Sequence, residues 1–179
     1  ANVITALQLE RIIPATGPTE GKLLRPSDHE KPHTLTFVSC MGSRDEHFHT
    51  YCSRFCCMYM IKQARLLKEK YPDLTINMHF IDVRAAGKGY DEYYTGARAM
   101  GINFFKGKVG GLEMLPNDRL RVLAYDMEAA TSIEYASDLV VLATAVELPP
   151  DAVGLAQKLG LQFCGDNFFR ELHPKLGPV

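Results

Sequence analysis

Four of the five cysteines lie within eighteen positions of one another, and thiolates grouped in this way bind metals. They are Cys40, Cys52, Cys56 and Cys57, of which the last two are adjacent. Four thiolates suit an iron–sulfur cluster, and four ligands also suit a structural zinc ion. The adjacent pair favours the cluster, because there each thiolate meets its own iron atom, whereas zinc would require both to converge on one ion.

Disulfide bonds or reactive thiols are a third interpretation of the same cysteines. Adjacent cysteines do not readily bridge each other, and no secretory signal is visible at the N-terminus. Clustered cysteines without an export signal indicate a reducing compartment, which predicts a cytoplasmic protein. Cys164, far from the other four in sequence, is predicted to be a free, partly buried thiol.

Alternating strands and helices are predicted to position the cysteines. The strands cover residues 34–40, 75–83 and 102–105, and the helices cover residues 53–71 and 90–100. This order is typical of parallel strands joined by right-handed crossovers. Cys40 then falls at the carboxyl end of the first strand, and Cys56 and Cys57 fall near the start of a helix, whose positive dipole end stabilises an anionic cluster.

A different pattern follows in the second half of the chain. Short strands predicted at residues 105–109, 111–115 and 119–126 suggest an antiparallel meander. A buried strand at residues 137–144 and a short helix at 151–159 come next. At the other end, helix and strand compete over residues 1–13, with a possible cap or turn at Thr5, and residues 14–32 read as a loop. The predicted fold class is α/β, a nucleotide-binding-type parallel sheet with an antiparallel meander.

The composition excludes several classes of protein. With 179 residues, 46% of them hydrophobic, the chain can bury one substantial core, and its net charge of −1 offers no footprint for nucleic acid or an anionic membrane. The best apolar stretch, residues 139–146, is strand length and too short to span a membrane. The sequence therefore predicts a soluble protein.

The loop after the first strand lacks the glycines of a dinucleotide site. Ligands of such folds bind beyond the carboxyl ends of the strands, yet residues 39–45 contain Gly42 alone instead of Gly-x-Gly-x-x-Gly. We infer that a metal cluster takes the place of a nicotinamide cofactor. A pyridine-nucleotide-disulfide oxidoreductase is the alternative enzyme, although it would also need a redox Cys-x-x-Cys; a zinc-stabilised interaction module is the alternative without catalysis.

Three segments, residues 40–45, 51–64 and 81–90, resemble the A subunit of heterodisulfide reductase and its relatives, and the similarity runs from Val3 to Val179. The resemblance implies an oxidoreductase with a thioredoxin-reductase-like architecture, of which this chain forms the pyridine-nucleotide-domain-like part. It implies that the four clustered cysteines hold a 4Fe-4S cluster, which relays electrons between FAD and partner subunits of a multi-subunit complex. It also implies that Lys62 and Glu10 sit close to FAD.

The resemblance also predicts how the chain is divided. Both flavin motifs of the family lie outside the matched region, so we expect an internal segment that is not catalytically complete alone. Residues 1–32 would link to the flavin domain, residues 33–147 would form the cluster-binding domain, and residues 148–179 would return towards the flavin domain. Without the resemblance, Lys62 reads as a solvated lysine and Glu10 as a surface ion-pair partner of Arg11. Arg44, in the cysteine loop, could donate hydrogen bonds to cluster sulfides.

Overall fold

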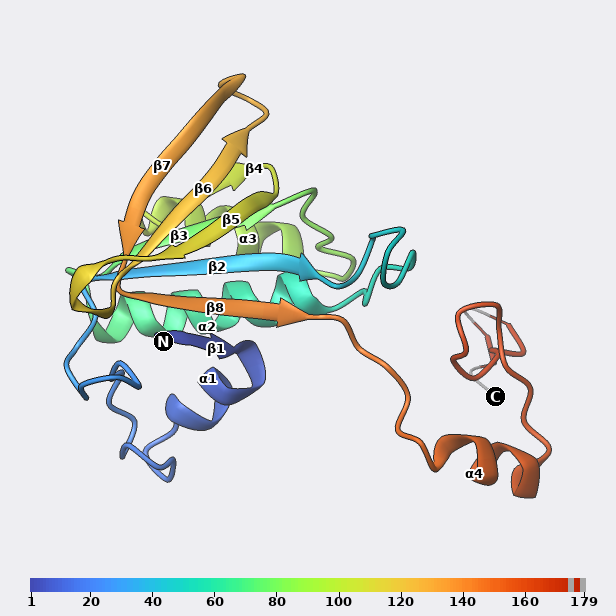
Figure 1. Ribbon diagram of the computed structural model, residues 1–179. Coiled ribbons are helices and arrows are strands. Elements are labelled where there is room, and N and C mark those ends of the chain that lie inside the picture. Colours follow the sequence, from blue (N-terminus) through green and yellow to red (C-terminus); the bar gives the residue numbers. More distant parts are fainter. Residues whose placement is uncertain (174–175, 178–179) are drawn as a thin grey trace.

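Two stacked β-sheets and a layer of helices make up the computed structural model, which describes residues 1–173, 176 and 177 (Figure 1). The larger sheet is parallel, with strand order β1-β8-β2-β3-β4, and the smaller one is antiparallel, with order β5-β6-β7. The strands are β1 (Val3–Thr5), β2 (Thr34–Met41), β3 (Thr75–Phe80), β4 (Asn103–Lys106), β5 (Val109–Met114), β6 (Leu120–Asp126), β7 (Thr131–Ser137) and β8 (Leu139–Thr144). The predicted fold class is confirmed.

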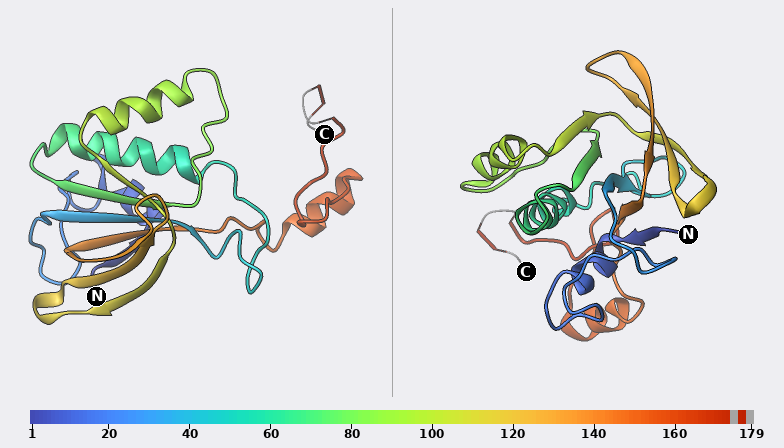
Figure 2. Two further views of the ribbon diagram at one scale, coloured as in Figure 1. Left: turned by 90° about the horizontal axis from the view of Figure 1, so that it is seen from above. Right: turned by 90° about the vertical axis from the view of Figure 1, so that its left-hand side faces the viewer.

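The helices within residues 6–99 lie on one face of the parallel sheet and the antiparallel sheet lies on the other, whereas the helix at residues 152–159 stands apart from both sheets, as Figure 2 shows. The helices are α1 (Ala6–Ile12), α2 (Cys56–Lys70), α3 (Tyr90–Ala99) and α4 (Ala152–Leu159). In β2, Leu35 and Phe37 pack towards the helices and Val38 packs towards the antiparallel sheet. Both faces of this strand are buried, which explains why it reads as a nearly continuous apolar run. No helix among the described residues is long and apolar enough to cross a membrane.

A small polar network is buried between the two sheets. The His79 ring stacks on Phe105, and its Nε2 lies 2.7 Å from the hydroxyl oxygen of Tyr135, which is also 3.2 Å from Oγ1 of Thr36. Burial lowers the pKa of His79 to about 4. This histidine is therefore neutral at physiological pH.

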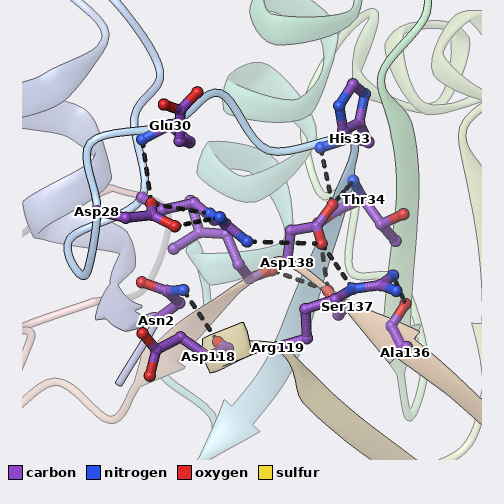
Figure 3. A network of polar contacts seen from close by, with 12 residues as sticks. Asn2, Asp28, Glu30, His33, Thr34, Asp118, Arg119, Ala136, Ser137 and Asp138 are labelled. Atoms are coloured by element: carbon purple, nitrogen blue, oxygen red, sulfur yellow. Dashed lines mark hydrogen bonds and ion pairs between the residues drawn. The ribbon is translucent and has the colours of Figure 1, made fainter. Parts of the chain in front are cut away.

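A second network closes the end of the sheet that lies opposite the cysteines (Figure 3). Asp138, buried between β7 and β8, accepts hydrogen bonds from the backbone N–H groups of His33 (2.8 Å) and Thr34 (2.9 Å). Nε of Arg119 donates to the other carboxylate oxygen at 2.8 Å, and Arg25 approaches it to 4.0 Å. One carboxylate thus joins the start of β2, the β7–β8 corner and the loop before β2.

After β8 the chain leaves the sheet, forms α4 and returns towards the cysteine loop. In this returning segment, the Phe168 ring packs edge to face against the Tyr51 ring, with 5.3 Å between the ring centroids. The Tyr51 hydroxyl also donates to the carbonyl oxygen of Val146 at 2.7 Å. Residues 163–171 therefore lie against the loop that carries Cys52.

The structure corrects two details of the predicted meander. Residues 105–109 are not one strand, because Phe105 and Lys106 belong to β4 and the chain turns at Gly107. A Cβ atom at Gly107 would lie 1.8 Å from the carbonyl oxygen of Tyr125, so only glycine fits this turn. The third strand of the meander is β7, which sequence analysis missed because its side chains are mostly polar and partly exposed.

The competition between helix and strand in the first thirteen residues is resolved by a capping box. The Thr5 hydroxyl accepts a hydrogen bond from the Gln8 N–H, and the Gln8 side chain accepts one from the Thr5 N–H. This motif ends β1 and begins α1 at once. The possible cap at Thr5 and the loop over residues 14–32 are confirmed.

Candidate functional site

Three of the four clustered cysteines come together at the carboxyl edge of the parallel sheet. Cys40 lies near the end of β2, and Cys56 and Cys57 are the first two residues of α2. All three are buried, with relative exposures of 7%, 2% and 5%. The Cys56 thiol lies between the other two and hydrogen-bonds to both sulfur atoms. The topology thus joins a strand end and a helix start into one group of thiols.

The backbone at Cys40 is bent to aim its side chain into this group. Its φ is +56°, in the left-handed region, and β2 has one extra residue between Val38 and Met41 relative to β8. A left-handed residue with a side chain costs about 1–2 kcal/mol, and a bulge of this kind redirects side chains. Arg44 and Arg54, in the loop that follows, are left-handed as well. Strained residues gathered in this way are typical of functional sites.

The hydrogen bonds among the thiols favour two of them as thiolates. Donation from Cys56 lowers the pKa of Cys40 to about 6, against the effect of burial. Donation from Cys56 likewise lowers the pKa of Cys57 to about 7, with help from the backbone N–H of Arg84. The pKa of Cys56 itself is raised, because its proton serves both neighbours. Thiolates, not thiols, bind metals.

Cys52 lies at the margin of this group. It is half-buried, and its sulfur accepts a hydrogen bond from the backbone N–H of Arg54 at 3.3 Å. It borders a cavity of about 300 Å³ that Cys164 also borders. Cys164 is free as predicted, but it is exposed rather than partly buried. Within the described part of the chain, no three His, Cys, Asp or Glu side chains are arranged to hold a metal ion, so the four-cysteine ligand set stays a prediction.

The two residues predicted to lie near a flavin contact each other. Nζ of Lys62, on α2, is 2.5 Å from Oε1 of Glu10, on α1. Gln63 donates to the other Glu10 oxygen at 2.8 Å and to the carbonyl oxygen of Ala6 at 2.9 Å. Burial raises the pKa of Glu10, but the hydrogen bonds from Lys62 and Gln63 outweigh it and the pKa is lowered. Glu10 is therefore an ion-pair partner of Lys62 rather than of Arg11.

Sequence analysis missed the charged residues that follow β3. The Asp82 carboxylate forms an ion pair with Arg44, and its backbone carbonyl oxygen lies 3.7 Å from the Cys57 sulfur. The signal was present in the sequence, because β3 is the parallel neighbour of β2. Parallel neighbours end at the same edge of a sheet, so a residue just after β3 had to lie near Cys40.

The fold has relatives of known structure, although no protein-family model matches the chain. An L-lysine 6-monooxygenase from Pseudomonas syringae superimposes with a TM-score of 0.53 at 10% identity, over 93% of this chain and 45% of the other. Thioredoxin reductase from T. acidophilum gives a TM-score of 0.50 at 8% identity, over 99% and 46%. These likenesses define the class of the fold, an α/β domain of the thioredoxin-reductase-like kind.

Sequence relatives identify the family within that class. A protein of Archaeoglobus profundus, described as like the heterodisulfide reductase A subunit, is 54% identical over 99% of this chain. The A subunit of the H2:CoB-CoM heterodisulfide,ferredoxin reductase of Methanothermobacter marburgensis is 45% identical, and the iron-sulfur A subunit of the CoB–CoM heterodisulfide reductase of Methanocaldococcus jannaschii is 43% identical, each over 99% of this chain. The chain belongs, as a segment, to the family of heterodisulfide reductase A subunits. It spans only 28%, 27% and 28% of the length of these three relatives.

Proposed function

We propose that this chain is the electron-transfer segment of a heterodisulfide-reductase-A-like iron–sulfur flavoprotein, relaying electrons between a 4Fe-4S cluster and FAD or partner subunits. The observation that carries the proposal is the group of three buried, hydrogen-bonded thiols formed by Cys40, Cys56 and Cys57. A buried group of thiols with two lowered pKa values suits thiolate ligation better than a purely packing role. When bound, the cluster would supply one-electron transfer.

The residues that would hold the cluster are Cys40, Cys52, Cys56 and Cys57. The donor set fits, because four thiolates are the usual ligands of such a cluster. Phe55, at the start of α2, provides no side-chain cap, so the helix end beside the cysteines keeps unpaired N–H groups that favour negative charge. Cys52 would be the ligand supplied by a loop rather than by a strand or helix. The name of the Methanocaldococcus jannaschii relative, which describes an iron-sulfur protein, agrees with this assignment.

The proposal extends to the complete protein. FAD would bind there, with Lys62 and Glu10 close to it, and residues 1–32 and 148–179 would belong with the flavin domain. The partners would be other reductase and electron-transfer subunits, since the names of two relatives describe subunits of CoB–CoM heterodisulfide reductases. A cytoplasmic location remains part of this proposal.

Anaerobic reconstitution with iron and sulfide tests the cluster directly. The expected product is brown and carries about four irons per chain. Cys56→Ser and Cys57→Ser, made singly, are each expected to lose the intact cluster, whereas Cys164→Ser, the matched control, retains it. Colourless protein carrying one zinc ion would support the zinc-stabilised module instead. A full spectrum in either serine variant would remove that cysteine from the ligand set.

A further inference from the structure

Arg44 is held in place by both its backbone and its side chain. Its backbone N–H donates to the carbonyl oxygen of Tyr51 at 2.9 Å, across the loop that precedes Cys52. Its guanidinium forms an ion pair with the Asp82 carboxylate, and the side chain is 23% exposed. The left-handed backbone at Arg44 directs the side chain inward at a conformational cost. A positive charge is therefore fixed at the edge of the cluster of thiols formed by Cys40, Cys56 and Cys57.

Asp82 connects this charge to the thiols. Its carboxylate also accepts a hydrogen bond from Nε of Arg84 at 3.4 Å. Its own backbone carbonyl oxygen lies 3.7 Å from the Cys57 sulfur. Because Asp82 contacts both Arg44 and Cys57, and Arg44 comes four residues after Cys40, the guanidinium lies near the three buried thiols. A positive and a negative charge thus face the thiols from two loops, one after β2 and one after β3.

We propose that Arg44 and Asp82 are positioning residues of opposite effect, Arg44 raising and Asp82 lowering the reduction potential of the iron–sulfur group held by the cysteines. This proposal rests on the proposed function. Reduction adds one electron and makes or breaks no bond, so the reduced group carries one more negative charge. A fixed positive charge nearby stabilises that form and a fixed negative charge destabilises it, and partial burial limits screening by solvent.

The test is a potentiometric titration of the reconstituted 179-residue chain with dithionite and mediators, followed by electron paramagnetic resonance. Arg44→Gln is expected to lower the potential and Asp82→Asn to raise it, each changing the ratio of reduced to oxidised protein at a fixed potential by about tenfold, or about 59 mV for one electron. The double variant is expected to return close to the wild-type value. Arg121→Gln is the control, because Arg121 pairs with Glu113 and Glu134 within the antiparallel sheet.

Opposite signs separate this role from a purely structural one. Loosening of the loop would shift both single variants in the same direction, and that result would overturn the proposal, as would shifts no larger than that of the control. Arg44→Lys keeps the charge and is expected to keep the potential. If the Arg44→Gln variant does not retain iron, the same test is made by comparing the reduction potentials of the Asp82→Asn and Asp82→Glu variants, of which only Asp82→Asn removes the negative charge. If the wild-type chain binds no iron after reconstitution, both the proposed function and this proposal are overturned. If it binds iron but the variants have the wild-type potential, only this proposal is overturned.

Discussion

Glu10 and Lys62 form an ion pair, with 2.5 Å between Oε1 and Nζ, that joins α1 to α2. The two residues lie far apart in the sequence, yet the family resemblance links each of them to a flavin. Their contact means that a ligand near one of them is also near the other. The pair is about two-fifths exposed on both sides, which leaves both side chains accessible to a neighbouring group.

Lys62→Gln is expected to have a small effect on stability and a larger one on the flavin. Exposed ion pairs contribute about 0–1 kcal/mol, so the free energy of unfolding in urea should change by less than about 1 kcal/mol. In the complete protein, loss of the ammonium is expected to lower the flavin reduction potential, because the positive charge favours the anionic reduced form. Lys70→Gln, at the far end of α2, is the control. Equal flavin potentials in the two variants would contradict the proximity of Lys62 to FAD.

Because the backbone of Cys40 is left-handed, we expect glycine to be more stabilising than alanine at this position, the reverse of their usual order within a strand. Cys40→Gly is expected to be more stable than Cys40→Ala by about 1 kcal/mol, because glycine adopts positive φ without strain. At the preceding residue the order should reverse, with Ser39→Ala more stable than Ser39→Gly by about 0.5–1 kcal/mol. Chemical denaturation of the four metal-free variants measures both differences. The same order at both positions would argue against the bulge.

His79 predicts a loss of stability in mild acid. Its pKa is about 4 in the folded protein and 6.5 ordinarily, so only the unfolded chain takes up the proton between these values. The contribution of neutral His79 to the free energy of unfolding is therefore fully present above about pH 6.5. It falls as the pH drops towards 4, by about 3 kcal/mol in total. His79→Phe keeps a ring against Phe105 and should flatten this part of the pH profile. An unchanged slope in the variant would assign the acid sensitivity to other groups.

Asp138 predicts a second loss at lower pH. Burial raises its pKa, but the hydrogen bonds from the His33 and Thr34 backbone and the charge of Arg119 outweigh it, so the folded pKa lies below the ordinary value of 3.8. Its stabilising effect is thus complete above about pH 4 and is lost as the pH falls through the folded pKa. Asp138→Asn at neutral pH is expected to cost about 2–3 kcal/mol.

Glu113→Gln is the matched control for the Asp138 variant. Glu113 also pairs with an arginine, but in an exposed position on the antiparallel sheet. Its replacement should change the free energy of unfolding by less than about 0.5 kcal/mol. Similar losses in the two variants, measured by urea denaturation, would show that the buried network does not anchor the sheet.

Local sequence signals were sufficient for most of the parallel sheet. The β2 strand is a run of β-branched and apolar residues, and α2 is rich in helix formers and stops before Pro72, so both were predictable to within a few residues. The place of Cys40 beside Cys56 and Cys57 followed from the order of these elements. What the sequence could not indicate was the left-handed backbone at Cys40, because its residue type gives no sign of positive φ.

Contacts between distant segments account for the rest of what was missed. Glu10 had Arg11 beside it in the sequence, and only the packing of α1 on α2 brings Lys62 closer. The β7 strand has a mostly polar sequence and is held by its pairing with β6. The contact of Phe168 with Tyr51 depends on where the segment after α4 returns, which no local pattern encodes.

The position of β1 in the sheet bears on the order in which the protein assembles. Within the described residues its strand neighbour is β8 alone, so that Val3 pairs with Val140 and Thr5 with Leu142. Contacts so distant along the chain form slowly, because a long loop must close first. During synthesis, β1 would be made before the other seven strands of this segment, and it could pair with β8 only after nearly the whole parallel sheet had been synthesised. Among these strands, β1 is thus expected to be one of the last to dock, and the α1–α2 ion pair would form with it.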